Sequence, residues 1–162
     1  MSGVHVSDRK ASPELLRYQV LAQKIDDAAT ALSANAIPKS YRFLIGVQMA
    51  NAADSLAEMV DLSMEFYPSC ALAAYDRKKC YSIAISKAKT LKRLMNKAIR
   101  RNWAKPAQFS ECIADIDEFI ACVRGLKKNV KIKGVESAED AIRWHKAQIK
   151  ALDALQSSDV AP

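Results

Sequence analysis

The stretch Arg77–Arg101, RKKCYSIAISKAKTLKRLMNKAIRR, decides the fold. Small and apolar side chains recur along it at steps of three and four residues, which is the spacing of one face of an α-helix. Lys89, Arg93 and Lys97 recur every four residues on the other side. Such an amphipathic helix must be covered on its apolar face, so the stretch predicts a bundle of packed helices. The residues predicted to face the core are Ala84, Ala88, Leu91, Leu94, Met95, Ala98 and Ile99.

Helical periodicity continues on both sides of this stretch, interrupted by breaks near Pro38, Pro68 and Pro106. Ser12-Pro13-Glu14 is a helix-start signal, because Ser caps the helix, Pro tolerates its first position and Glu suits the positive end of its dipole. Residues 69–76 fit either a loop or an early turn of the helix that follows. We expect bundle helices at about 13–34, 39–66, 77–101 and 107–128.

The expected helix at 39–66 carries two further features. Gly46 lies inside it and either permits the close approach of another helix or is merely tolerated there. An acidic row follows, which is either a solvated face or a contact with the basic surface of a neighbouring subunit. The row consists of Asp54, Glu58, Asp61 and Glu65, and the predicted buried residues of this helix are Phe43, Val47, Ala50, Leu56, Met59, Val60 and Ser63.

The end of the chain predicts one more helix. Ser137-Ala138-Glu139-Asp140 resembles a capping sequence, and a less regular apolar stripe follows it to about Leu155. The fold class is therefore all-α, an antiparallel four-helix bundle with an additional C-terminal helix. The expected parts are a flexible leader at 1–12, the bundle at 13–130, and a linker, helix and frayed tail at 131–162.

Composition agrees with this interpretation. The chain has 162 residues, half of them apolar, with only four Gly and five Pro, which suits one helical domain with a sizeable core. The first twelve residues lack the apolar centre of a signal peptide. No window approaches eighteen uncharged apolar residues, the length needed to span a membrane. We therefore expect a cytoplasmic protein that does not enter membranes.

Catalytic and metal-binding signatures are missing from the sequence. The four cysteines form no Cys-x-x-Cys pair, and the two histidines, His5 and His145, lie near opposite ends of the chain. Gly-rich phosphate loops and nucleophile elbows are absent. Carboxylates cluster at Asp115, Asp117 and Glu118, but helical spacing alone makes such clusters common. We expect a non-enzymatic protein with no cofactor or metal, and a small enzyme remains only a distant alternative.

The distribution of charged residues is the feature of the sequence that indicates a function. From Arg77 to Ser110 the chain carries eleven Lys or Arg residues and no acidic residue, while its formal net charge is +7. Concentrated charge of one sign predicts a polyanionic partner, and the scarcity of aromatic residues favours contact with a phosphate backbone over base stacking. The alternatives are a solvated face, a membrane-surface helix, and a protein scaffold whose basic face binds an acidic partner. The candidate nucleic-acid-binding residues are Lys87, Lys89, Lys92, Arg93, Lys97, Arg100, Arg101 and Lys105.

Several segments resemble one family. The run IPKSYRFLIG at 37–46, followed by AADSLAE at 52–58, resembles the second helix of the four-helix-bundle proteins related to the accessory variability determinant, Avd. Residues 87–95, KAKTLKRLM, resemble that family's basic third helix, and 109–125 its final helix. These proteins accompany the reverse transcriptases of diversity-generating retroelements, and related bundles are encoded in intervening sequences of ribosomal RNA genes.

The resemblance implies more than the residues do by themselves. It implies a homopentameric barrel with a basic exterior, which binds the reverse transcriptase and template RNA or an RNA–DNA hybrid. Such a subunit assists mutagenic complementary-DNA synthesis without catalysing it. The chain departs from the family at 120–125, where a Gly-Gly-Trp-like ending is usual, and in the added segment after Gly134.

Overall fold

The computed structural model describes residues 12–132 and 138–158, and all regular secondary structure within them is helical. The predicted all-α class is therefore confirmed. Residues 1–11 of the predicted leader at 1–12, the linker residues 133–137 with the capping Ser137, and residues 159–162 of the predicted frayed tail lie outside the described residues. In chain order the elements are α1 (Pro13–Asn35), a 3₁₀ turn (Lys39–Tyr41), a π-helical turn (Arg42–Gly46), α2 (Val47–Glu65), α3 (Ala71–Arg100), α4 (Pro106–Asn129) and α5 (Ala138–Ser158).

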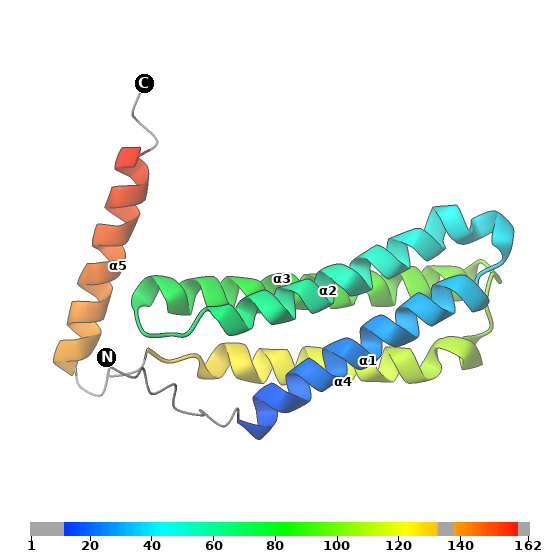
Figure 1. Ribbon diagram of the computed structural model, residues 1–162, viewed down its shortest axis with the longest axis horizontal. Coiled ribbons are helices and arrows are strands. Elements are labelled where there is room, and N and C mark those ends of the chain that lie inside the picture. The colour runs from blue at the N-terminus through cyan, green and yellow to red at the C-terminus, as the bar shows by residue number, and fades with distance from the viewer. Residues whose placement is uncertain (1–11, 133–137, 159–162) are drawn as a thin grey trace, which may run out of the picture.

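The first four α-helices share one hydrophobic core (Figure 1). Helices α1 and α3 each pack against both α2 and α4. Large aromatic side chains fill the centre: the ring of Tyr18 meets Tyr81 edge-on and stacks on Phe119, with ring centroids 5.5 Å apart in both pairs. These pairs bind three helices together, because the two tyrosines and Phe119 come from α1, α3 and α4. Helix α5 contacts α3 at one end of the bundle and is directed away from it (Figure 1).

The start of α1 follows its sequence signal. Ser12 has an extended backbone, and its hydroxyl oxygen accepts a hydrogen bond from the Leu15 N–H at 3.3 Å. Pro13 and Glu14 occupy the first turn as expected. The cap satisfies one of the N–H groups that a helix start leaves without a partner, and the predicted boundary is confirmed.

The predicted helix at 39–66 is not a regular α-helix along its whole length. In the π-helical turn the N–H of Val47 bonds to the carbonyl of Arg42, five residues earlier. This wider turn contains one extra residue, so side chains before it are rotated relative to an α-helical pattern. The predicted burial of Phe43 is wrong for that reason: it is 88% exposed, and Ile45 is buried instead. The predicted burial of Val47 is also wrong: as the first residue of α2 it lies nine positions before the buried Leu56, on the opposite side of the helix, and is 46% exposed.

Gly46 marks a close approach between segments. A Cβ atom built there would lie 3.0 Å from the backbone oxygen of Ser33, near the end of α1. A backbone oxygen cannot move aside as a side chain can, so the absence of a side chain at this position lets α1 and the start of α2 meet. The close-approach interpretation of this glycine is the one that the geometry favours.

Helix α3 begins at Ala71, about two turns before the start expected at Arg77, so residues 71–76 are helical. It ends at a turn in which Asn102 has φ of 57°, a left-handed conformation that Asn tolerates. Trp103, in the same turn, stacks on Tyr41 with ring centroids 4.4 Å apart. Helix α4 continues past Gly125 to Asn129, so that glycine does not end it.

Candidate nucleic-acid interface

Four basic side chains form a continuous exposed line on α3. Lys89, Arg93, Lys97 and Arg100 are all exposed, and the helical period puts them opposite the buried residues Leu91, Met95 and Ala98. None of the four forms an ion pair with another residue in ranges 12–132 and 138–158. We call these four residues the α3 basic stripe.

The other four predicted binding residues occupy different surroundings. Arg101 and Lys105 are exposed in the turn between α3 and α4 and extend the stripe at its end. Lys87 is half-buried on the flank of α3. Lys92 is also half-buried, and its ammonium group donates to both carboxylate oxygens of Asp117 on α4, at 2.6 and 2.7 Å. Its charge is thereby matched within the protein, which makes Lys92 a weaker phosphate ligand than the stripe residues.

A second basic feature lies toward the other end of α3 and was not among the predicted site residues. Lys78, Arg124, Lys127 and Lys128 surround a hollow of about 410 Å³ over Ile85. A second hollow of about 500 Å³ shares Lys78 and Lys127 and adds Lys79 and the exposed Tyr75. Among the described residues, no acidic side chain lines either hollow. We call Lys78, Lys79, Arg124, Lys127 and Lys128 the α3–α4 basic groove.

The stripe and the α3 residues of the groove lie along one helix. From Lys79 to Arg100 the rise of an α-helix gives about 30 Å, and both residues are exposed. Tyr75, at 60% exposure, is placed beside the groove cations and offers a ring on which an unpaired base could stack. The signal for the groove was present in the sequence, since residues 124–133 hold five basic residues and no acid.

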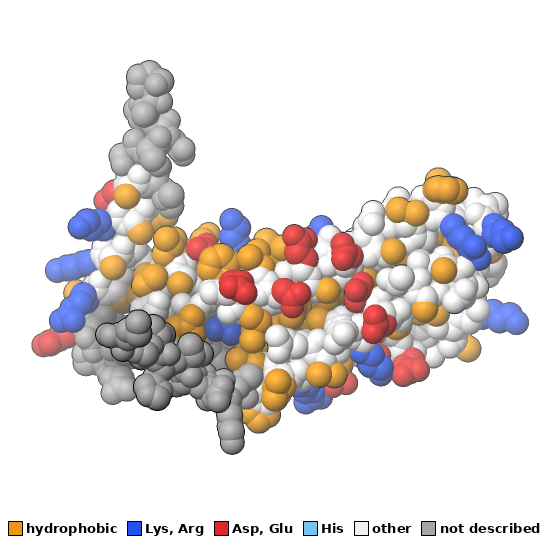
Figure 2. Space-filling model, in the orientation of Figure 1, with side chains coloured by type: hydrophobic (Ala, Val, Ile, Leu, Met, Phe, Trp, Pro, Cys, Tyr) orange, Lys and Arg blue, Asp and Glu red, His pale blue; other side chains and the backbone are white. Residues whose placement is uncertain are grey.

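The opposite charge gathers on another face. Asp54, Glu58, Asp61 and Glu65 of α2 are all exposed, and Figure 2 shows acidic side chains clustered over α1 and α2. Partial burial, with the nearby charges of Asp54 and Asp27, raises the pKa of Asp26 on α1. Carboxylates crowded in this way repel a polyanion, so the two α3 features are the faces available to one.

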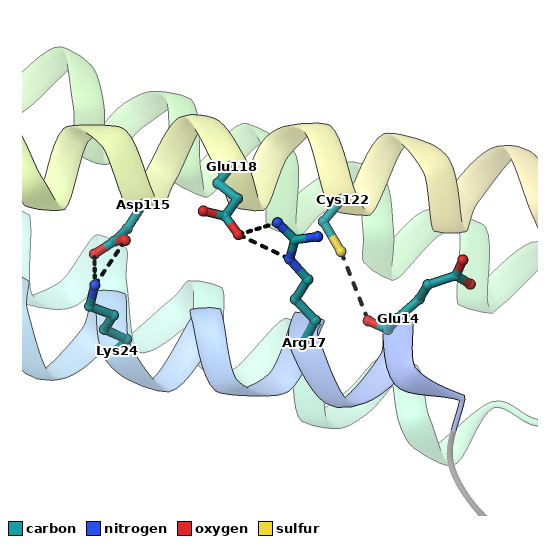
Figure 3. A network of polar contacts seen from close by, with 6 residues as sticks. All are labelled: Glu14, Arg17, Lys24, Asp115, Glu118 and Cys122. Atoms are coloured by element: carbon teal, nitrogen blue, oxygen red, sulfur yellow. Dashed lines mark hydrogen bonds and ion pairs between the residues drawn. The ribbon is translucent and has the colours of Figure 1, made fainter.

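The carboxylates of α4 take part in ion pairs between helices. In the seam between α1 and α4 (Figure 3), Arg17 donates to Glu118 and Lys24 donates to Asp115 at 3.0 Å. The thiol of Cys122 donates a long contact of 3.9 Å to the backbone oxygen of Glu14. With Lys92 on Asp117, each carboxylate of the acidic cluster predicted on this helix holds a cation of a neighbouring helix.

Thiol chemistry and metal binding find little support in the described ranges. The four cysteines are free, and burial raises the pKa of the Cys112 thiol to about 11, which disfavours the reactive thiolate. Across residues 12–132 and 138–158 no group of three His, Cys, Asp or Glu side chains could hold a metal ion. No helix in these ranges has the length and apolar character needed to cross a membrane.

The chain was compared with known families and proteins. No protein-family model matches it, and no curated protein matches it either.

Proposed function

We propose that this protein is a non-enzymatic, nucleic-acid-binding accessory subunit of a retroelement reverse transcriptase. The observation that carries the proposal is the α3 basic stripe, a line of four exposed cations without ion-pair partners in the described part of the chain. The reverse transcriptase and the mutagenic complementary-DNA synthesis come from the resemblance to the Avd family. The proposed site of action is the cytoplasm.

Binding works through phosphate contacts. Lys and Arg along α3 displace counterions condensed on the nucleic acid, which gives affinity without a requirement for sequence. Successive stripe residues are four and three positions apart, so their cations are spaced by about 5–6 Å along the helix. The α3–α4 basic groove continues the track, and Tyr75 gives it some capacity for single-stranded bases. Template RNA and its RNA–DNA hybrid are the proposed ligands.

The proposed architecture is an antiparallel four-helix bundle with α5 added. Short connections between α2 and α3 (66–70) and between α3 and α4 (101–105) support it, because helices joined by a few residues usually pack as antiparallel neighbours. The family resemblance extends the proposal to a homopentamer. The acidic row of α2 and the α3 basic stripe each extend over twelve residues, eleven helical steps or about 16 Å, and this match supports pairing of the two surfaces between subunits.

A salt series with purified protein tests the proposal. The ligands are a structured RNA, an RNA–DNA hybrid and a DNA duplex, and the variant carries Lys89→Glu, Arg93→Glu and Lys97→Glu together. We expect tight binding by the wild type with a steep salt dependence, and weak binding with a shallower slope by the variant. Unchanged affinity in a folded triple variant would reject the assignment of the stripe.

The second candidate function is a protein scaffold in which the basic face binds an acidic protein. The exposed acidic row on α2 favours it, because the chain itself presents a suitable counterpart. This function predicts an oligomer in native mass spectrometry together with negligible affinity for RNA at physiological salt. A monomer at micromolar concentration would exclude both subunit pairing and the pentamer.

A further inference from the structure

One basic residue of α3 does not face solvent. Arg77, which begins the acid-free run of the sequence, is only 8% exposed. A buried guanidinium is costly unless it has a counter-charge and full hydrogen bonding. Arg77 forms no ion pair with any acidic residue in ranges 12–132 and 138–158. Its surroundings therefore need a separate explanation.

The donors of Arg77 are only partly used. Its Nε donates to the Tyr81 hydroxyl at 3.0 Å, and its Nη2 donates to the Met64 sulfur over a nitrogen–sulfur distance of 3.9 Å. Sulfur is a weak acceptor, and a guanidinium has five N–H groups in a fixed fork. No further hydrogen bond joins Arg77 to a described residue, and none of its nitrogen atoms is a fully buried atom without a partner, so the remaining donors are accessible from the surface.

Those donors border a cavity. Arg77 and Tyr81 line a space of about 320 Å³ that lies among the start of α1, the turn before α3 and the end of α4. Its other charged lining residues are Lys131 and Glu14, and Glu14 forms no ion pair with Arg77. Apolar side chains supply most of the remaining wall, namely Leu15, Pro68, Leu126, Val130 and Ile132.

We propose that this cavity is a binding site for a small organic carboxylate, in which Arg77 donates hydrogen bonds to both carboxylate oxygens. A planar carboxylate matches the guanidinium fork in a bidentate arrangement. The apolar wall covers the hydrocarbon body of the ligand, as is usual in small-molecule pockets. Glu14 at the same cavity disfavours a second negative charge, so a monoanion is preferred to a phosphate dianion.

The test uses hexanoate as the probe and hexanamide as its uncharged counterpart of similar shape. Isothermal titration at constant ionic strength should show saturable hexanoate binding by the full chain, with a dissociation constant of about 1 mM or tighter. Arg77→Met should weaken binding by about 10- to 100-fold, because it removes hydrogen bonds to a charged group. Inorganic phosphate should bind more weakly than hexanoate.

Two further variants keep the result interpretable. Lys89→Met removes one cation from the α3 basic stripe, outside the cavity, and should leave hexanoate binding unchanged. Arg77→Lys retains the charge but loses the fork, so it should bind hexanoate less tightly than the wild type even if Arg77→Met does not fold. The proposal is overturned if the wild type shows no saturable binding up to about 10 mM, if hexanamide binds equally well, or if the Arg77→Lys protein binds as the wild type does.

Discussion

Neutralising two residues of the α3 basic stripe gives the sharpest quantitative prediction. Arg93→Gln and Lys97→Gln together remove two exposed cations that form no ion pair within the described residues. Each phosphate contact contributes about 0.7 (single strand) to 0.9 (duplex) to the slope of log K against log salt. The double variant should therefore have a slope smaller by about 1.4–1.8.

The same relation gives the loss of affinity. Relative to 1 M salt, where the counterion contribution vanishes, two contacts contribute about 1.2–1.5 log units at 0.15 M. The double variant should bind about 15- to 30-fold more weakly at that salt concentration. Because the two side chains are exposed, its free energy of unfolding should stay within about 0.5 kcal/mol of the wild type.

Fluorescence anisotropy with a labelled RNA, repeated at five salt concentrations, measures both quantities. The matched control is Lys146→Gln with Lys150→Gln, which removes the same charge from exposed positions on α5. If only net charge mattered, both double variants would lose affinity equally. That result, or an unchanged slope in the stripe variant, would refute phosphate contact by the stripe.

Three further predictions concern stability and thiol chemistry. Gly125→Ala should raise the free energy of unfolding by about 0.5–1 kcal/mol in urea denaturation, since nothing lies within 4 Å of the added Cβ. Gly46→Ala should give no gain, because its Cβ meets a backbone oxygen at 3.0 Å, and equal gains in the two variants would contradict the close approach. Trp103→Ala should lower stability by at least about 1 kcal/mol, because it removes the stack on Tyr41, and an unchanged thermal midpoint would argue against that contact. Burial raises the pKa of Cys112 in the folded state, so its contribution to stability is complete below the ordinary pKa of 9.0 and is lost as the pH rises toward about 11. The wild type should therefore lose stability relative to Cys112→Ala over that interval, and parallel pH profiles of the two proteins would show that burial does not raise this pKa.

Helix positions were largely predictable because their signals are local. The Ser12 cap and the proline breaks depend on backbone geometry over a few residues, and the structure has helix boundaries close to those positions. The core residues Ala88, Leu91 and Met95 followed equally well from periodicity. These features need no knowledge of which helix packs against which.

The predictions of burial fail at positions where the three-dimensional course of the chain decides which side chain is buried. The predicted burial of Phe43 is wrong because the π-helical turn after Tyr41 changes the rotation of the chain, and no residue type in that segment signals such a turn. Arg77 resembled its basic neighbours in the sequence, yet its position on the wheel of α3 turns it inward beside Tyr81.

The candidate site could likewise be predicted from the sequence only in part. The exposed stripe residues could be found from spacing alone. The pairing of Lys92 with Asp117 could not, because it depends on how α3 and α4 are aligned. The α3–α4 basic groove needed the same alignment, since it joins Lys78 to Arg124 and Lys127 across 46 or more positions of sequence.

The separation of the acidic row of α2 from the basic stripe of α3 has a kinetic consequence. A molecule whose two charge signs lie on different helices has a permanent electric dipole. A nucleic acid that approaches by diffusion turns such a molecule before the two surfaces touch, so fewer encounters meet the wrong face. Added salt should then act mainly by slowing association, while the lifetime of the complex, once formed, depends on the short-range contacts of the individual cations.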